Sequence, residues 1–359
     1  MLGERFKYDA KPQIKLNPLQ ERIKSQIESK IKNGYYKTEE VPCPICEGQA
    51  FETLAEKDRF GLPLSVVICR DCGLIQSNPR MDQASYNKLY SQEYNMLTHG
   101  EEKPTKEFFF DRYFFGQKIY RYLKEFFSKN CKDMFVLEVG CSSGGILAYF
   151  RDKGCQVLGL DIGEEYVRFG RENYNLDLRT GTFLSCPLER KPDIIIMSHV
   201  LEHLLRPQEE LNFVKSLLNE KGFVYIEVPG IKNIPHNYYD FNFLNYLRIA
   251  HVYHFSLASL ENLLNKNGFR LLKGDERIRS ISRPGETRSS YISCYHKDLS
   301  SLRHFESVRK YMPVTPFKMR NALESSCAWL LRKVRMYALM RKLYRRAIHR
   351  IEPKASLKK

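Results

Sequence analysis

Mostly apolar runs and amphipathic stretches alternate along the second half of the chain. The apolar runs have the length and continuity of strands that are buried on both faces of a sheet. They are Met134–Leu137, Val157–Leu160, Asp193–Met197 and Phe223–Val228. Stretches with helical periodicity lie between them, at about 145–153, 164–174 and 207–220. Strand and helix in this alternation predict an α/β fold with a mainly parallel, doubly wound sheet.

The pattern extends on both sides of this core. After it, a helix at Leu257–Asn267 is followed by a strand-like stretch at Arg270–Lys273, and we expect Tyr291–Tyr295 to close the sheet. Before it, apolar residues repeat every four positions between Pro18 and Gly34 and predict a short amphipathic helix. Residues 104–130 are helical in composition and crowded with aromatic rings, which favours a packing helix over a lid on a substrate pocket.

Composition and charge divide the chain unevenly. The 359 residues carry a net charge of +16, but 301–359 alone hold 16 Lys or Arg against three Glu. We therefore expect five parts: an N-terminal helical segment at 1–40, a small metal-binding fold at 41–80, a helical connector or lid at 81–130, the α/β domain at 131–300 and a basic helical tail at 301–359. The chain shows neither an apolar run of about 18 residues nor an apolar leader, which predicts a cytoplasmic protein.

Four of the ten cysteines form two tight pairs. Cys43 and Cys46 stand in Cys-Pro-Ile-Cys, and Cys69 and Cys72 stand in Cys-Arg-Asp-Cys. Two strand-like stretches, Ala50–Glu56 and Leu64–Cys69, lie between the pairs and predict a hairpin that brings them together. Four thiolates on two such turns form a closed tetrahedral zinc site, so we expect a zinc ribbon whose ion is structural.

A glycine-rich turn follows the first strand of the α/β domain. Glu138 stands two positions before Gly140, Gly144 follows in a Gly-x-x-x-Gly pattern, and Asp161 ends the next strand. At that separation an acidic side chain can accept hydrogen bonds from both hydroxyls of a ribose. A carboxylate at Glu138 suits a cationic ligand better than a pyrophosphate. S-adenosylmethionine carries an ammonium and a sulfonium, so the turn favours methyl transfer over hydride transfer.

With these motifs the sequence resembles the class I S-adenosylmethionine-dependent methyltransferases, whose sheet is Rossmann-like. The resemblance rests on Leu137–Gly145, Asp161, Pro192–Leu204 and Gly222–Pro229. Residues 41–97 and 251–269 further resemble a subgroup that joins a four-cysteine zinc ribbon to this domain, and that is associated with bacterial surface-polysaccharide and modified-sugar biosynthesis.

The resemblance implies roles for single residues. Glu138, Gly140 and Gly144 would form the cofactor loop, with Asp161 on the ribose and Ile162 against the adenine. Ser198 and His199, at the tip of the fourth strand, would lie beside the methionine moiety. Two departures stand out: Ser142 replaces a glycine of the loop, and Thr182-Phe183 lacks the acidic residue that often contacts the adenine.

A methyl acceptor must also lose a proton, and histidine is the natural base near neutral pH. His203 and His199 are the nearest candidates, with His251 and His254 behind them. A structural hydrogen bond is the alternative for His203, and a packing role is the alternative for His254. Enzymes of the subgroup that methylate sugar carbon often show His-Glu-His where this chain has His-Val-Tyr-His, which favours a hydroxyl acceptor over a carbon acceptor.

The basic tail allows three interpretations. A helix over Phe317–Ile351 would collect apolar residues on one arc and Arg and Lys on the other. Such a helix favours peripheral contact with an anionic membrane, near a lipid-linked glycan at its inner face. Packing on the domain or on a partner, and nucleic-acid binding, are the alternatives, and the last lacks an RNA-binding signature.

The sequence thus predicts a methyltransferase that uses S-adenosylmethionine and acts on a small-molecule or lipid-linked sugar, with a structural zinc ion. An RNA methyltransferase and a cofactor-binding module without activity are the alternatives. The identity of the acceptor and the oligomeric state stay open.

Overall fold

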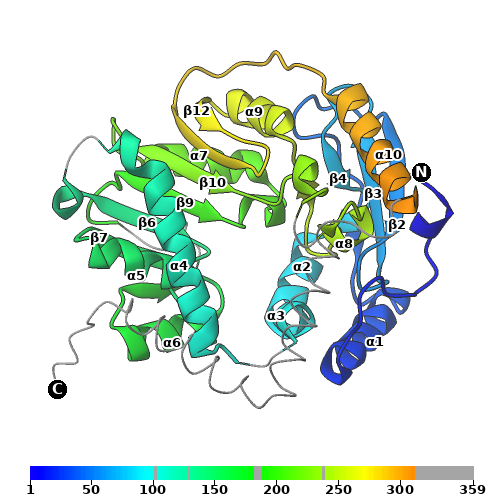
Figure 1. Cartoon of the computed structure of the whole chain (residues 1–359), viewed down its shortest axis with the longest axis horizontal. Coiled ribbons are helices and arrows are strands. Elements are labelled where there is room, and N and C mark those ends of the chain that lie inside the picture. Colours follow the sequence, from blue (N-terminus) through cyan, green and yellow to red (C-terminus); the bar gives the residue numbers. More distant parts are fainter. Residues whose placement is uncertain (101–102, 128–129, 182–187, 237–238, 312–359) are drawn as a thin grey trace, which may run out of the picture.

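The computed structural model describes residues 1–100, 103–127, 130–181, 188–236 and 239–311. The helix expected over Phe317–Ile351 and the Thr182-Phe183 position lie outside these residues. Figure 1 shows the chain as two neighbouring parts, one around the sheet that contains β6 and one around β2, β3 and β4.

A seven-stranded sheet forms the larger part, in the order β12-β13-β10-β9-β6-β7-β8. The strands are β6 (Phe135–Val139), β7 (Gln156–Asp161), β8 (Leu178–Thr180), β9 (Ile194–Ser198), β10 (Phe223–Glu227), β12 (Phe269–Gly274) and β13 (Arg279–Pro284). Strands β8, β7, β6, β9 and β10 pair in parallel, and β13 pairs antiparallel with both β10 and β12. The expected α/β fold with a mainly parallel sheet is confirmed.

The strand that completes the sheet is not the expected one. Residues Arg279–Pro284 form β13 between β10 and β12, whereas Tyr291–Tyr295 form no strand. The expectation failed because β13 has buried serines where an apolar pattern was sought: Ser280 and Ser282 are fully buried, and the Ser280 hydroxyl donates to the Ile226 carbonyl at 3.0 Å. The backbone N–H of Cys294 instead donates to the Cys72 carbonyl, which fastens this segment to the cysteine turn.

Helices cover both faces of the sheet. They are α4 (Lys106–Leu123), α5 (Gly145–Asp152), α6 (Glu164–Tyr174), α7 (Pro207–Leu217) and α9 (Leu257–Lys266). One apolar cluster joins α4, α5 and α6 to one face, through residues such as Ile119, Ile146 and Val167. A second cluster joins α7 and α9 to the other face and continues into the smaller part, so the two parts share a core.

The smaller part is a ribbon with a four-stranded sheet in the order β11-β4-β3-β2. Its strands are β2 (Phe51–Lys57), β3 (Pro63–Cys69), β4 (Ile75–Ser77) and β11 (Tyr253–His254), and the pair β1 (Thr38–Glu39) and β5 (Arg80–Met81) lies apart from it. The expected hairpin is confirmed in β2 and β3, which pair antiparallel. Strand β11 comes from the segment between β10 and α9, so the late part of the chain completes the sheet of the ribbon.

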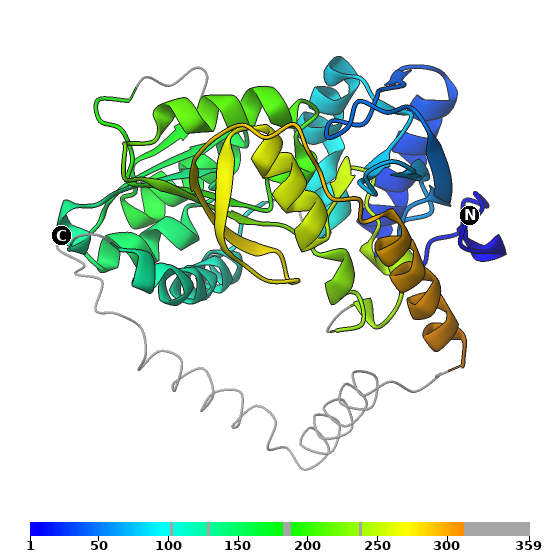
Figure 2. The same ribbon diagram turned by 90° about the horizontal axis from the view of Figure 1, so that it is seen from above.

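Further helices surround the ribbon. They are α1 (Pro18–Lys32), α2 (Gln83–Leu89), α3 (Asn95–His99), α8 (Phe243–Tyr246) and α10 (Tyr295–Tyr311). Figure 2 shows α10, in orange, on the side of the ribbon and away from the seven-stranded sheet. The Tyr295 hydroxyl donates to Glu52 Oε2 of β2 at 2.6 Å, which ties α10 to the ribbon.

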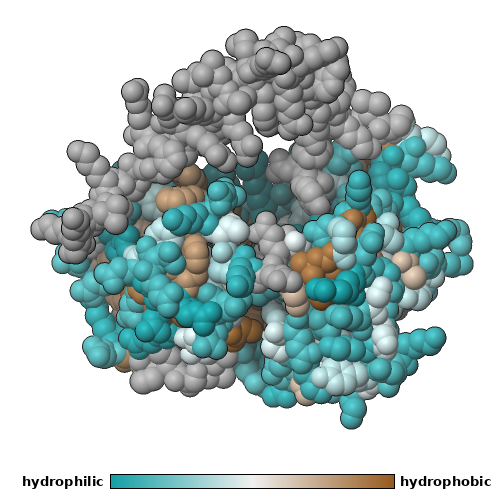
Figure 3. Space-filling model, turned by 90° about the horizontal axis from the view of Figure 1, so that it is seen from below, coloured by the Kyte–Doolittle hydropathy of each residue, from teal (hydrophilic) through white to brown (hydrophobic). Residues whose placement is uncertain are grey.

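Within the described ranges, no helix combines the length and the apolar character that crossing a membrane requires. The face in Figure 3 is mostly hydrophilic, with small hydrophobic areas among the hydrophilic residues.

Candidate functional site

The glycine-rich turn between β6 and α5 lies at the carboxyl edge of the parallel strands, where open α/β sheets bind their ligands. Gly140, Ser142 and Gly144 all adopt positive φ, at 71°, 50° and 76°. A side chain at Gly140 would place its Cβ 2.6 Å from Val200 Cγ2, so the turn runs directly against the loop that follows β9. Ser142, which replaces a glycine of the loop, adopts the left-handed backbone conformation that a glycine would adopt with less strain.

Asp161, at the end of β7, fastens this turn. Its Oδ2 accepts a hydrogen bond from the Ser142 N–H, and its Oδ1 accepts one from the Gly163 N–H, each at 2.7 Å. Burial raises the pKa of Asp161, and the two backbone donors oppose that rise. Each carboxylate oxygen keeps a further lone pair for a ligand hydroxyl. The next residue, Ile162, is 59% exposed and so offers an apolar surface beside that carboxylate.

Glu138 is the buried acid of the turn. The residue is 1% exposed, and its Oε2 accepts no hydrogen bond from a residue that the structure describes. Burial raises the pKa of Glu138 to about 8; Arg112 opposes the rise and Asp161 adds to it. A buried carboxyl group with an unused oxygen fits an ammonium or sulfonium ligand, since a nearby positive charge favours its ionised form.

Arg112 of α4 is a functional candidate that the sequence did not indicate. Its guanidinium donates to Ser198 Oγ at 3.3 Å and lies 4.8 Å from the centre of the Phe115 ring. Burial lowers the pKa of Arg112, and the charges of Glu138 and Glu227 oppose this. Arginine is common on helices, so the sequence of α4 gave no reason to single out Arg112. Only the packing of α4 on α5 shows that it lies at the site.

His199 and Glu202 occupy the loop that follows β9. His199 has a φ of 59°, and its N–H donates to the Glu227 carbonyl at 2.7 Å. Its Nδ1 lies 3.3 Å from Glu202 Oε1, while its side chain stays 40% exposed. Burial alone would raise the pKa of Glu202, but His203 and His199 hold it below its usual value. An exposed imidazole backed by a buried carboxylate is an arrangement that suits a general base.

His203 lies deeper, with its side chain 16% exposed. Its Nδ1 contacts the Tyr90 hydroxyl and lies 2.9 Å from the Ala250 carbonyl. Because a carbonyl can only accept, the contact with Ala250 requires a proton on Nδ1, and the neutral ring then keeps its lone pair on Nε2. That Nε2 lies 3.7 Å from Glu202 Oε1. Burial lowers the pKa of His203.

The late histidines join the same region. The ring centres of His251 and His203 are 4.8 Å apart, and those of His251 and His254 are 6.2 Å apart. Both late histidines are buried, and burial lowers the pKa of His254 to about 3. The Val252 N–H donates to the Glu202 carbonyl at 2.7 Å and holds the two segments together. Glu202, in the loop after β9, thus places a carboxylate beside His251, which belongs to the segment before β11.

The structure therefore brings the expected cofactor residues and the expected histidines to one edge of the sheet. The link between them runs through groups that the sequence did not single out, namely Arg112, Glu202 and Glu227. Glu227 is partly buried, and its electrostatic partners include both His199 and Arg112. Glu202 stands between two histidines in His-Val-Leu-Glu-His, and this pattern could have indicated it as a functional residue.

The two cysteine pairs meet as expected. Cys43 Sγ lies 3.4 Å from Cys72 Sγ, and Cys46 Sγ lies 3.4 Å from Cys69 Sγ. All four sulfur atoms lie within 4.8 Å of one another, which qualifies them as a metal-binding group. A tetrahedral zinc site with Zn–S bonds of about 2.3 Å separates its sulfur atoms by about 3.8 Å, so the donor set fits zinc.

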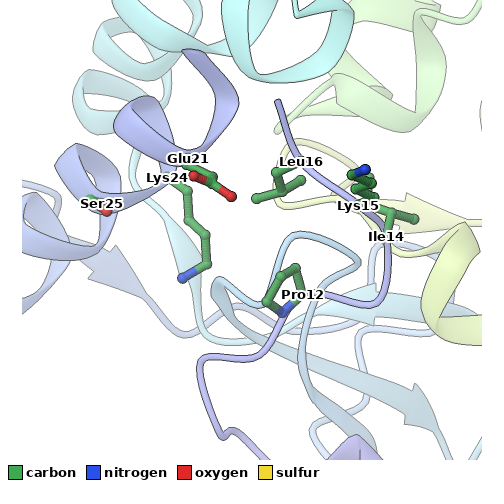
Figure 4. Close-up of a pocket in the computed structure, with 7 residues that line it drawn as sticks. All are labelled: Pro12, Ile14, Lys15, Leu16, Glu21, Lys24 and Ser25. Atoms are coloured by element: carbon green, nitrogen blue, oxygen red, sulfur yellow. The ribbon is translucent and has the colours of Figure 1, made fainter. Parts of the chain in front are cut away.

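A hollow near the N-terminus does not belong to this region. It lies between residues 12–16 and the start of α1 and has a volume of about 510 Å³ (Figure 4). None of the candidate cofactor, acceptor or metal residues lines it.

Comparisons with known proteins agree with this geometry. Residues 110–273 match the family described as "Methyltransferase domain". An uncharacterized methyltransferase of Staphylococcus carnosus is 25% identical over 132 residues, which cover 37% of this chain and 59% of that protein. One of Alkaliphilus oremlandii is 26% identical over 98 residues, which cover 26% of this chain and 45% of that protein. The chain thus spans about half the length of the curated relatives it matches.

Among solved structures, an S-adenosylmethionine-dependent methyltransferase from Clostridium acetobutylicum aligns with a TM-score of 0.38 and 12% identity. The alignment covers 56% of this chain and 99% of that one. The family match and the seven-stranded sheet together identify residues 110–273 as a class I S-adenosylmethionine-dependent methyltransferase domain.

Proposed function

We propose that the protein is an S-adenosylmethionine-dependent methyltransferase that methylates a hydroxyl group of a sugar or glycan intermediate. The observation that carries the proposal is Glu138, a buried carboxyl group with an unused oxygen beside a glycine turn. Such a group disfavours the phosphates of a nicotinamide cofactor and attracts a cation.

The cofactor would lie along the edge from Asp161 to Ser198. Asp161 would accept from the ribose, Ile162 would cover the adenine, and Gly140 and Gly144 would leave room for the backbone to pass close to the ligand. When bound, S-adenosylmethionine supplies an activated methyl group on a sulfonium. The protein's own tasks are to align the acceptor oxygen with that methyl group and to remove a proton.

His199 is the better of the two candidate bases. It is more exposed than His203, and Glu202 lies beside its Nδ1. Its Nε2 would take the proton of the acceptor hydroxyl while the oxygen forms its bond to the methyl carbon. The carbon–sulfur bond breaks in the same step, and its electron pair stays on sulfur. His203 is held by Tyr90 and Ala250 and lies beside Glu202.

The acceptor class is supported by the sequence resemblance of residues 41–97 and 251–269 to zinc-ribbon methyltransferases of sugar biosynthesis. In this chain the ribbon adjoins the proposed acceptor side, because β11 lies next to His251 in the chain and pairs with β4. We propose that the ribbon holds one structural zinc ion on Cys43, Cys46, Cys69 and Cys72. A closed shell of four thiolates leaves no position for a substrate.

Radiolabelled S-adenosylmethionine tests the function. The full chain and an Asp161→Ala variant receive extracts that are fractionated into nucleotide sugars, lipid-linked glycans and RNA. We expect label in a sugar-containing pool with the unaltered chain alone. Label in RNA would favour the RNA methyltransferase alternative instead. Calorimetry should show binding of S-adenosylmethionine and its demethylated product; cofactor binding without transfer to any pool would favour a non-catalytic module.

We also propose that residues 317–359 contact anionic membranes, because 301–359 carry most of the net positive charge. Deleting 317–359 should release the protein from anionic vesicles at physiological salt and leave cofactor affinity unchanged. Equal retention of both proteins on the vesicles would contradict this proposal.

A further inference from the structure

Glu202, His203 and His251 form a second group of metal-binding donors, separate from the four cysteines. One ligand atom from each residue lies within 4.8 Å of the other two. Glu202 and His251 are 1% and 3% exposed. Two imidazoles and one carboxylate are a donor set that divalent transition metals use when part of the coordination shell is left to water or substrate.

Three polar atoms of this group, both Glu202 oxygens and His251 Nδ1, lack a hydrogen-bonding partner among the described residues. Buried polar atoms without partners are costly, so each such atom calls for an explanation.

No hydrogen bond joins His203 to Glu202. When His203 donates its Nδ1–H to the Ala250 carbonyl and is neutral, its Nε2 presents a lone pair to Glu202. The separation of 3.7 Å between this Nε2 and Glu202 Oε1 is too long for a hydrogen bond. Lone pairs of Glu202, His203 and His251 thus lie close together without a shared proton donor, an arrangement that a cation would stabilise.

The backbone fixes the donors in place. The Val252 N–H binds the Glu202 carbonyl at 2.7 Å, and the Ser77 hydroxyl binds the His251 carbonyl at 3.1 Å. With metal–ligand bonds of about 2.1 Å, two ligands lie at most about 4.2 Å apart, so side-chain shifts below about 1 Å would close the set. The Nδ1–H of His203 on a carbonyl is also the usual support of a metal-binding imidazole.

We infer that Glu202, His203 and His251 bind a divalent first-row transition metal at the acceptor side. Because Glu202 also adjoins His199, the ion would lie next to the proposed base. There it would bind the acceptor oxygen and lower the pKa of its hydroxyl group. This role rests on the proposed function, whereas the existence of the site does not.

Cobalt titration of the full-length protein with its ribbon cysteines intact tests the site. Co²⁺ on four thiolates gives an intense charge-transfer absorption, whereas Co²⁺ on nitrogen and oxygen gives only weak visible bands. We expect about one equivalent of Co²⁺ to bind with the weak visible bands of nitrogen and oxygen ligands. Glu202→Gln and His251→Asn should each weaken it by at least about tenfold, whereas the exposed His296→Asn should not change it.

Two results would overturn the inference: no nitrogen–oxygen Co²⁺ spectrum in the unaltered protein, or the same affinity in both variants and in His203→Asn. Calorimetry with the demethylated cofactor on the same samples shows, independently of metal binding, whether each protein is folded and binds the cofactor. Metal uptake without methyl transfer would uphold the site while rejecting the proposed function. Methyl transfer without metal uptake would uphold the proposed function while rejecting the site.

Discussion

The cofactor half and the acceptor half of the candidate site are built in different ways. Most of the cofactor half lies within residues 138–163, where one strand, one turn and the tip of the next strand supply Glu138, Asp161 and Ile162; Ser198 adds to it from β9. The acceptor half combines the loop after β9, the tyrosines near 90, the segment 247–254 and the ribbon. A contiguous motif therefore makes one half, and packing between distant segments makes the other.

The ribbon is what holds the acceptor half together. Arg80 donates to the Leu205 carbonyl at 2.7 Å and to the Tyr253 hydroxyl at 2.9 Å. Asp58, which is fully buried, accepts from the Ile249 N–H at 3.0 Å. Burial raises the pKa of Asp58 to about 7, and its backbone donors oppose the rise. The difference between the halves indicates that damage to the ribbon should affect the acceptor more than the cofactor.

The largest effect should come from removing the proposed zinc ligands. Cys43→Ser with Cys69→Ser should abolish both metal binding in the ribbon and methyl transfer, because metal binding supplies much of the folding free energy of so small a fold. Affinity for the demethylated cofactor should fall by less than about tenfold, since the turn at 140–144 is fastened by its own hydrogen bonds. Elemental analysis and calorimetry measure the two effects, with Cys131→Ser as the control. Retained methyl transfer would refute the role of the ribbon.

The next largest effect should follow from His199→Gln. Loss of a general base costs a factor of about 10² to 10⁴ in kcat, and the affinity for the cofactor should fall much less, because most of the cofactor residues lie within 138–163. His236→Gln, at an exposed position, is the matched control. Unaltered kcat in the His199 variant would leave His203 as the candidate base.

Asp161→Asn should weaken the cofactor half alone. The Ser142 and Gly163 N–H groups bind different oxygens of Asp161, and an amide replaces one of these oxygens with an NH2 donor. One of the two N–H groups therefore loses its acceptor, so the variant should bind the demethylated cofactor about 10- to 100-fold less tightly. Metal content should not change. Asp177→Asn replaces an exposed aspartate nearby in the sequence and controls for the loss of one charge. Equal affinity in both variants would show that Asp161 does not contact the cofactor.

The smallest effect is a pH dependence that originates at Glu138. Because its pKa is raised to about 8, the carboxyl group is mostly protonated at pH 7, and a cationic cofactor requires it ionised. Affinity for S-adenosylmethionine should therefore fall by up to about tenfold for each pH unit below 8, and Glu138→Gln should bind weakly with a flatter profile. Calorimetry at several pH values measures this, and parallel profiles would contradict it.

The stability of the ligand-free protein should change in the opposite direction. The folded chain keeps the Glu138 proton at pH values where the unfolded chain has released it. This contribution to the free energy of unfolding is complete below the ordinary pKa of 4.5 and is lost as pH rises to about 8. The free energy of unfolding should change by at most about 1.4 kcal/mol per pH unit. Urea unfolding of the protein and of Glu138→Gln should show it, and identical slopes would count against it.

Much of this could be predicted from local patterns. The strands β6, β7, β9 and β10 are mostly apolar, the glycine turn has a fixed spacing to Asp161, and the cysteine pairs have a metal-ligand spacing. Strand β13 could not be predicted, because its buried serines look polar in the sequence, and the partner of the Ser280 hydroxyl lies on β10. Arg112 could not be found either, since its partners lie on β6, β9 and β10.

The sequence by itself determined the α/β fold, the turn that receives the cofactor and the four cysteines, because each depends on residues close together in the chain. Only the tertiary structure decided that β11 joins the ribbon, that Glu202 meets His251 and that Arg112 faces Glu138. These contacts join segments far apart in the sequence. Burial and hydrogen bonding select them when the whole chain packs, and no local pattern records that selection.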